Sequence, residues 1–205
     1  MELSQRWKNR RTERWFSDAD VEEEKIKKLC DVIPHIPSQQ SIVDHYWCCF
    51  SKDEKEMRDF LFYHVFLSKK GFDRNHVDDD ILHFGSILTA PYVLVGLHRS
   101  GMPSHNDIGL HTGVLLATAL ELELDVATMG CQAGFVKVKK FNKLIRKHRN
   151  IPDKNHLIPV MAVCVGYKER HPKEYFYLED GTRVNTQLSV DRDRKPNNFV
   201  GKHEQ

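Results

Sequence analysis

Apolar residues recur at helical intervals in four stretches of the chain. In the first stretch, Ser17 with Asp20 resembles a capping box, three glutamates follow, and Pro34 ends the predicted helix. Asp107 is placed to cap a long helix that is apolar on most sides and therefore expected to be buried. The four predicted helices cover residues 17–33, 57–65, 108–123 and 141–148.

Shorter apolar runs predict four strands. They cover residues 46–50, 91–97, 126–129 and 158–165. The run PYVLVGL at 91–97 is β-branched and bounded by proline and a basic residue, which is typical of a central strand. Cys48 and Cys49 are neighbours on a strand and should point to opposite faces. Helices and strands alternate irregularly, so the class is α+β or mixed α/β, and the absence of a linker or repeat predicts one domain, 1–205.

Composition narrows the classes of function. The 205 residues carry 31 Lys and Arg against 29 Asp and Glu, a net charge of +2 that is small for a non-specific nucleic-acid binder. The longest apolar run, 158–165, is too short to cross a bilayer. The polar start MELSQRWKNRR does not resemble a signal peptide, and five cysteines, two of them adjacent, indicate a reduced protein. We therefore expect a cytoplasmic protein with no nucleic-acid or membrane partner.

The histidines and cysteines do not form a recognisable catalytic or metal motif. Twelve histidines are present, but no CxxC or HExxH spacing occurs, so no metal site is expected. His98, His105 and His111 are expected at the surface or at helix ends. The basic run at 146–149 is interpreted as a solvated helix end, since cations are favourable at that pole of the helix dipole. No Ser-His-Asp or Cys-His constellation is expected, and no catalytic side chain is assigned.

Four separated segments carry candidate chemistry. RRTERWF at 10–16 and DRDRKP at 191–196 are rich in arginine, whose guanidinium groups bind phosphate in a bidentate manner. IPSQQS at 36–41 is a small polar loop, and the segment 106–132 runs from an apolar helix through a short strand to a Met-Gly-Cys turn. Taken singly, they are more often a surface patch, a charged tail, an ordinary connection and a core helix, respectively.

Together and in this order, the segments resemble the FMN-dependent nitroreductase family. The resemblance covers most of the chain outside 51–88, and the matching residues are Arg10, Arg11, Thr12, Arg14, Phe16, Pro37, Ser38, Asp107, Gly109, Leu116, Ala117, Ala119, the strand end VMAVCVGY, Arg194 and Pro196. It implies an α+β three-layer sandwich, in which helices flank a central, mainly antiparallel sheet. It also implies a homodimer with FMN at the interface.

The resemblance also implies roles for individual residues. Those matching the family's phosphate-binding positions are Arg10, Arg11, Thr12, Arg192 and Arg194. Arg14 matches the basic residue near the flavin pyrimidine. The turn whose amides approach the flavin N5 and O4 edge is matched by Met129, Gly130 and Cys131. The loop on the other side of the ring is matched by Pro37, Ser38, Gln39 and Ser41.

The implied activity is hydride transfer from NADH or NADPH, through FMN, to a nitro-aromatic, quinone or similar small-molecule acceptor by a ping-pong mechanism. Two departures keep alternatives open. QQSIVDHYW at 39–47 replaces an Asn-x-Gln-Pro-Trp type motif, and Glu123 stands where a glycine usually ends the central helix. Reductive dehalogenation, flavin breakdown, or a non-catalytic flavin-binding or interaction module are the alternatives.

Overall fold

The computed structural model describes most of the secondary structure of the chain. The described residues are 2–10, 12–13, 15–38, 45–62, 85–99, 105–131, 138–149, 151, 157–169, 175–177 and 183–185. The helices are α1 (Leu3–Asn9), α2 (Glu23–Asp31), the 3-10 turn η1 (Ile33–His35), α3 (Lys55–Phe60), α5 (His105–Glu121) and α6 (Val138–His148). The strands are β1 (His45–Ser51), β2 (Tyr92–Arg99), β3 (Asp125–Gly130), β4 (Leu157–Gly166), β5 (Tyr175–Tyr177) and β6 (Arg183–Asn185).

Four strands form one antiparallel sheet in the order β1-β2-β4-β3. The run 91–97 was predicted to be a central strand, and β2 indeed lies inside the sheet between β1 and β4. Strand β3 lies at one edge, where half of its backbone groups point away from β4. Strands β5 and β6 pair with each other in a separate two-stranded sheet.

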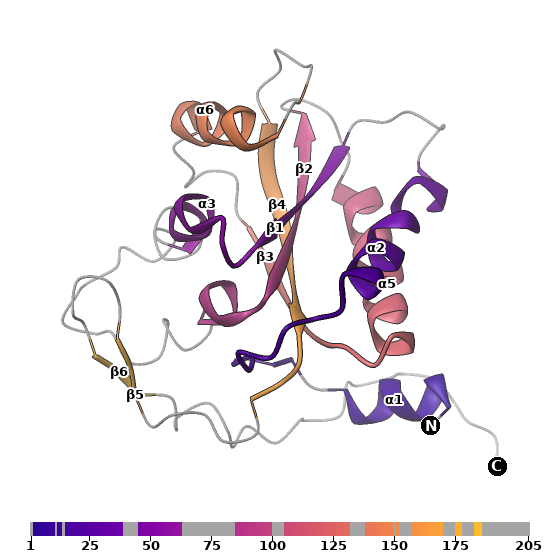
Figure 1. The fold of residues 1–205 in the computed structure, drawn as a ribbon. Helices are drawn as coiled ribbons and strands as arrows, with labels where there is room; N and C mark the ends of the chain where they lie inside the picture. The colour runs from indigo at the N-terminus through magenta and orange to yellow at the C-terminus, as the bar shows by residue number, and fades with distance from the viewer. Residues whose placement is uncertain are drawn as a thin grey trace, which may run out of the picture.

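Helices cover both faces of the sheet, which gives three layers. Figure 1 shows α3 and α6 on one side and α2 and α5 on the other. Alternate side chains of β2 point to opposite faces of the sheet. Val93 and Val95 belong to the core cluster under α3 and α6, whereas Leu94 belongs to the cluster under α2 and α5. The predicted α+β sandwich with a mainly antiparallel sheet is confirmed. Among the described residues, no helix combines the length and the apolar character needed to cross a membrane.

Helix α2 begins later than predicted. It begins at Glu23 with Glu22 as its N-cap, and no side chain caps it. Ser17 instead donates its backbone N–H to the Tyr167 carbonyl at 2.8 Å, so the expected capping box is wrong. The bond to Tyr167 holds the chain extended at this point, and extended backbone cannot also be the first turn of a helix. Helix α5 starts at His105, which puts Asp107 in the first turn rather than at the cap.

Two histidines expected at the surface are buried. His98 is 5% exposed and His111 is 3% exposed. The His111 ring stacks on Trp47 with centroids 6.5 Å apart and planes 6° apart. The expectation was wrong because β2 is an inner strand and α5 packs on the sheet. The side chain of His105 lies outside the described residues.

Polar side chains fasten α3 and α6 to the sheet. Arg58 of α3 is 2% exposed and donates to the carbonyls of Ile87 and Ala90, each at 2.6 Å. Burial lowers the pKa of this guanidinium. Asn142 of α6 donates to the Leu157 carbonyl at 2.9 Å and accepts from the Leu157 N–H at 2.8 Å. These bonds satisfy buried backbone groups that would otherwise be left without partners.

Candidate functional site

Described residues of the arginine-rich motif bond to the sheet near the start of β3. The N–H of Glu13 donates to the Val126 carbonyl of β3 at 3.2 Å, and the N–H of Glu169 donates to the Trp15 carbonyl at 3.1 Å. Trp15 and Phe16 are 8% and 4% exposed and act as apolar anchors for this segment. A Cβ at Gly166 would lie 2.9 Å from Phe16 and 2.5 Å from the Pro91 ring, so only glycine fits beneath the segment.

Of the three phosphate-binding positions predicted in this segment, the structure describes Arg10 and Thr12. Arg10 ends α1, and its guanidinium lies 6.0 Å from the centroid of the Trp7 ring. Thr12 is exposed. Arg10 also lines a cavity of about 210 Å³ between α1, the end of α5 and the start of β3. This volume could hold a phosphate group but not a whole dinucleotide or flavin.

The charges around this cavity are balanced. Its cationic lining consists of Arg6, Arg10 and Lys168, and its acidic lining of Glu13, Glu123 and Asp125. Arg6 forms an ion pair with Glu123 and donates to the Leu120 carbonyl at 3.1 Å. The hydrogen bond from Arg6 lowers the pKa of the Glu123 carboxyl. Arg6 and Lys168 were not predicted as site residues; the helical spacing of Arg6 and Arg10, four positions apart, was the available signal.

Glu123 lies two residues after the end of α5 and has a left-handed conformation, with φ of 64°. The Leu124 N–H bonds to the Ala119 carbonyl at 2.9 Å and the Glu123 N–H bonds to Leu120 at 3.2 Å, the pattern of a Schellman motif. The exit from this helix is therefore the one that glycine favours, made here with a strained glutamate. The Arg6 ion pair gives this side chain a role that glycine could not fill.

The predicted Met-Gly-Cys turn lies at the opposite end of β3. The Cys131 N–H donates to the Val160 carbonyl at 2.6 Å and is therefore used inside the sheet. Since inward and outward groups alternate along an edge strand, the amides of Thr128 and Gly130 point away from β4. Gly130 is exposed, and a Cβ placed on it would meet nothing within 4 Å. Met129 is buried and accepts a hydrogen bond from the Ser86 hydroxyl at 3.6 Å.

Strand β3 therefore separates the two parts of the predicted site. Arg10 lies near its first residue and Gly130 is its last, and five residue steps of an antiparallel strand span roughly 17 Å. Pro37 is exposed and Ser38 is half-buried, both after η1. The remaining predicted residues lie outside the described residues: Arg11, Arg14, Gln39, Ser41, Arg192 and Arg194.

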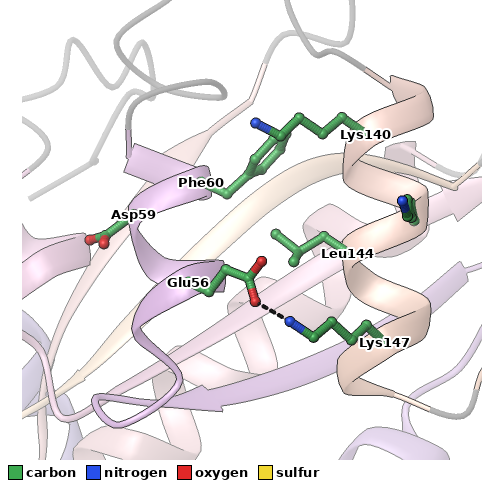
Figure 2. Close-up of a pocket in the computed structure, with 7 residues that line it drawn as sticks. Glu56, Asp59, Phe60, Lys140, Leu144 and Lys147 are labelled. Atoms are coloured by element: carbon green, nitrogen blue, oxygen red, sulfur yellow. Dashed lines mark hydrogen bonds and ion pairs between the residues drawn. The ribbon is translucent and has the colours of Figure 1, made fainter.

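A second hollow of about 660 Å³ lies between α3 and α6. Figure 2 shows Glu56 and Lys147 joined across it, with Nζ and Oε2 2.6 Å apart, and Lys140 reaching over the Phe60 ring at 5.7 Å. None of the residues lining this groove was predicted to bind cofactor. Its lysines belong to the amphipathic α6, whose helical spacing was recognised without a function being assigned.

The basic run 146–149 differs from the solvated helix end that we expected. Arg149 donates both terminal nitrogens to Glu54, at 2.6 and 2.8 Å, and its guanidinium lies 4.6 Å from the Phe50 ring centroid. Partial burial by itself would raise the pKa of Glu54, but the bonds from Arg149 and the Ser51 amide hold it below its usual value. This end of α6 is thus attached to the start of α3. Within the described ranges, no group of three or more His, Cys, Asp or Glu side chains could hold a metal ion.

In sequence, the chain matches no protein-family profile and no curated protein. Its structure is similar to a nitroreductase with bound FMN from Bacteroides fragilis, with a TM-score of 0.65 and 12% identity over 89% of this chain and 97% of that one. The chain has the nitroreductase fold.

Two further solved structures share this nitroreductase fold. A nitroreductase family protein from Clostridium novyi has a TM-score of 0.61 and 14% identity, over 91% of this chain and 95% of that one. A BluB-like flavoprotein from Clostridium difficile has a TM-score of 0.60 and 15% identity, over 84% and 93% of the two chains. The similarity extends over nearly the full length of these proteins, so it concerns the whole fold rather than one motif.

Proposed function

We propose that this protein binds FMN and transfers hydride from NADH or NADPH to a small organic acceptor. The observation that carries the proposal is the position of the arginine motif within a nitroreductase fold. Glu13 bonds to Val126 near the start of β3, and Gly130 ends the same strand. This arrangement supports a phosphate-binding segment at one end of the strand and a ring-binding turn at the other. The similar protein from Bacteroides fragilis was solved with bound FMN, which supports the same cofactor here.

The described residues fit parts of such a cofactor. Arg10 offers a guanidinium for the phosphate, and Arg11, Arg192 and Arg194 are proposed to complete the cationic set. Arg14 is proposed to lie near the flavin pyrimidine. Thr128 and Gly130 offer outward amides, and the missing side chain of Gly130 leaves room for a flat ring to approach. When bound, FMN would supply the hydride-transfer chemistry, and the chain would position the ring and leave one face open.

The proposed acceptors are nitro-aromatic, quinone or similar compounds, reduced after the nicotinamide has left, in a ping-pong sequence. We place the protein in the cytoplasm. Five cysteines, two of them adjacent, are typical of a protein that is kept reduced.

We further propose a homodimer that uses the outer face of α5. Leu110 is 48% exposed on this helix, and neither Gly109 nor Gly113 has an atom within 4 Å of a built Cβ. These residues form an open strip of small and apolar positions on one side of α5. A second helix can approach such a strip closely and cover Leu110.

The first test is reconstitution with FMN followed by anaerobic titration with NADH and NADPH. We expect a yellow protein whose flavin absorbance bleaches on addition of one nicotinamide and returns with a quinone or nitro-aromatic acceptor. Arg10→Gln should weaken FMN binding by roughly tenfold, because a charge-assisted bond to phosphate is lost. Lys8→Gln, an exposed cation on the same helix, is the matched control.

The other outcomes identify different functions. Halide release from an aromatic substrate would indicate dehalogenation, and irreversible loss of the flavin spectrum would indicate flavin breakdown. A yellow protein that neither nicotinamide can bleach would be a flavin-binding module. A colourless protein that FMN cannot reconstitute would overturn the cofactor proposal itself.

A further inference from the structure

Two cysteines from different elements meet where α2 packs on the sheet. Cys30 belongs to α2 and Cys49 to β1, and both pack against the core cluster that contains Leu29 and Leu94. The two thiols are joined by a hydrogen bond, with Cys49 as the donor and the Cys30 sulfur as the acceptor. Their sulfurs are therefore neighbours, although they are separated by the whole loop between α2 and β1.

These two thiols are more accessible than two others in the core. Cys30 and Cys49 are each half-buried, whereas Cys48 and Cys164 are buried. Cys48 is next to Cys49 in sequence but points to the opposite face, under α3 and α6, as the alternation of strand residues predicted. A small solute that reaches Cys30 would therefore find Cys49 beside it and Cys48 out of reach.

The surroundings of the pair give the two sulfurs different reactivity. The hydrogen bond from Cys49 lowers the pKa of the Cys30 thiol, against the opposing effects of burial and of the neighbouring Asp31. The same bond raises the pKa of Cys49, as does its burial. Cys30 is thus the better nucleophile toward an oxidant, and Cys49 is a protonated thiol held in contact with it.

We propose that Cys30 and Cys49 form a peroxide-sensitive thiol pair, which oxidation converts reversibly into an intrachain disulfide between α2 and β1. In the first step the Cys30 thiolate attacks hydrogen peroxide, the O–O bond breaks, and a sulfenic acid and hydroxide form. In the second step the Cys49 sulfur attacks the Cys30 sulfur. An S–S bond forms, the S–O bond of the sulfenic acid breaks, its hydroxyl group leaves with the Cys49 proton as water, and the two thiols are together oxidised by two electrons.

The disulfide would close a ring of residues 30–49. This ring contains η1, Pro37 and Ser38, which precede β1 in the chain. Oxidation would therefore fix both ends of the loop to each other through a covalent bond, and reduction would release them. No cofactor takes part in this thiol chemistry, so its test is independent of the proposed function.

The test uses the full chain, purified without reductant and treated with hydrogen peroxide. After unreacted thiols have been alkylated, we expect a non-reducing peptide map to show a Cys30–Cys49 cross-link, and dithiothreitol to reverse it. The mass of the intact chain should fall by two hydrogens in the same reaction. Wild-type protein suffices for this measurement, so it does not depend on the folding of a variant.

Two variants sharpen the result. Cys49→Ser should abolish the cross-link and leave a Cys30 sulfenic acid that dimedone traps, whereas Cys48→Ser should cross-link as the wild type does. The proposal is overturned if both thiols remain alkylatable after the peroxide has been consumed. It is equally overturned if Cys30 is oxidised to the sulfinic acid without a cross-link, or if either cysteine pairs with Cys131 or with a second chain.

Discussion

The two faces of the sheet are held in different ways. Under α3 and α6, buried polar side chains bond directly to the backbone: Arg58 to Ile87 and Ala90, and Asn142 to Leu157. Under α2 and α5 the described contacts are mainly apolar, with the Cys30 and Cys49 thiols among them.

This difference means that the α3 and α6 layer has a fixed position, whereas the α2 and α5 layer keeps surface that can bind a partner. A buried polar anchor tolerates little movement, since a shifted partner leaves an unsatisfied group in a dry environment. Apolar packing has no such directional demand, and α5 keeps an open strip around Leu110 on its outer side. We infer that the α3 and α6 face sets the shape of the sheet, whereas the α2 and α5 face holds the proposed dimer contact and the proposed thiol pair.

The largest effect should come from removing the Arg58 anchor. Arg58→Met keeps most of the volume but leaves the Ile87 and Ala90 carbonyls without their donor, so we expect the free energy of unfolding to fall by about 3 kcal/mol. Urea unfolding followed by circular dichroism measures this. Arg146→Met, at an exposed arginine of α6, should change stability by less than about 0.5 kcal/mol. Equal losses in the two variants would contradict the anchor.

Asn142→Leu should have the next largest effect. It removes a reciprocal pair of bonds with the Leu157 backbone, and we expect a loss of about 2 kcal/mol by the same unfolding measurement. Lys143→Leu, at the next and exposed position, is its control. If Asn142→Leu were neutral, apolar packing alone would hold α6, and the contrast between the faces would disappear.

A charge on the open face of α5 should break the proposed dimer. Leu110→Glu places a carboxylate where a second helix would cover it, so we expect dimer dissociation to become roughly tenfold more favourable, with little change in monomer folding. Light scattering after gel filtration over a range of concentrations measures this. Lys139→Glu on α6 is the control for a charge change elsewhere. A wild-type protein that is already monomeric at high concentration would contradict the proposed dimer.

The thiols on the two sides of the sheet should differ in how fast they are alkylated, because their pKa values differ. Burial raises the pKa of Cys48 to about 11 and that of Cys164 to about 12, so at pH 8 only about one Cys48 in a thousand is a thiolate. We expect iodoacetamide to alkylate Cys30 well before Cys48 or Cys164, as read by peptide mapping. Rapid labelling of Cys48 in the folded protein would show that the core under α3 and α6 opens to solvent.

The same raised pKa values fix the sign of a stability change. The folded state favours the protonated thiols, so their contribution is complete below the unfolded-state pKa near 9 and is lost as pH rises toward 11 and 12. Denaturant midpoints between pH 8 and pH 11 should fall more steeply in wild type than in Cys48→Ala.

The smallest effect is expected at the end of α5. Glu123→Gly removes the cost of a left-handed glutamate but also removes the Arg6 ion pair, so the midpoint of thermal unfolding should rise only slightly. Glu123→Gln keeps the strain and weakens the pair, and its midpoint should fall below that of wild type. A lower midpoint for the glycine variant than for wild type would show that the ion pair outweighs the strain.

Sequence periodicity predicted the sheet better than it predicted the helix starts. The apolar runs at 46–50, 91–97 and 158–165 correspond to β1, β2 and β4, because buried strands need nearly continuous apolar residues. Ser17 was misplaced because a capping pattern is local, whereas its bond to Tyr167 depends on a residue 150 positions away. No local sequence pattern predicts a hydrogen-bond partner at that distance.

The roles of the candidate site residues stay predictions, whereas the structure gives the positions of some of them. The arginine motif and the Met-Gly-Cys turn were both found from residue type, and the structure puts Arg10 and Gly130 near opposite ends of one strand. Arg58 was missed because a lone arginine in a charged stretch looks like a surface residue until its carbonyl partners are known. The amphipathic pattern of α6 predicted a helix with a basic side. The ion pair between Arg149 and Glu54 could not be predicted, because it depends on the tertiary fold.

The hydrogen bonds of the N-terminal segment set an order on the synthesis of the chain. The partners of Trp15 and Ser17, which are Glu169 and Tyr167, are synthesised about 150 residues after them. At typical elongation rates of about 5–20 residues per second, Trp15 and Ser17 are without these backbone partners for roughly ten seconds or more. A nascent chain stopped before Tyr167 would therefore lack both hydrogen bonds.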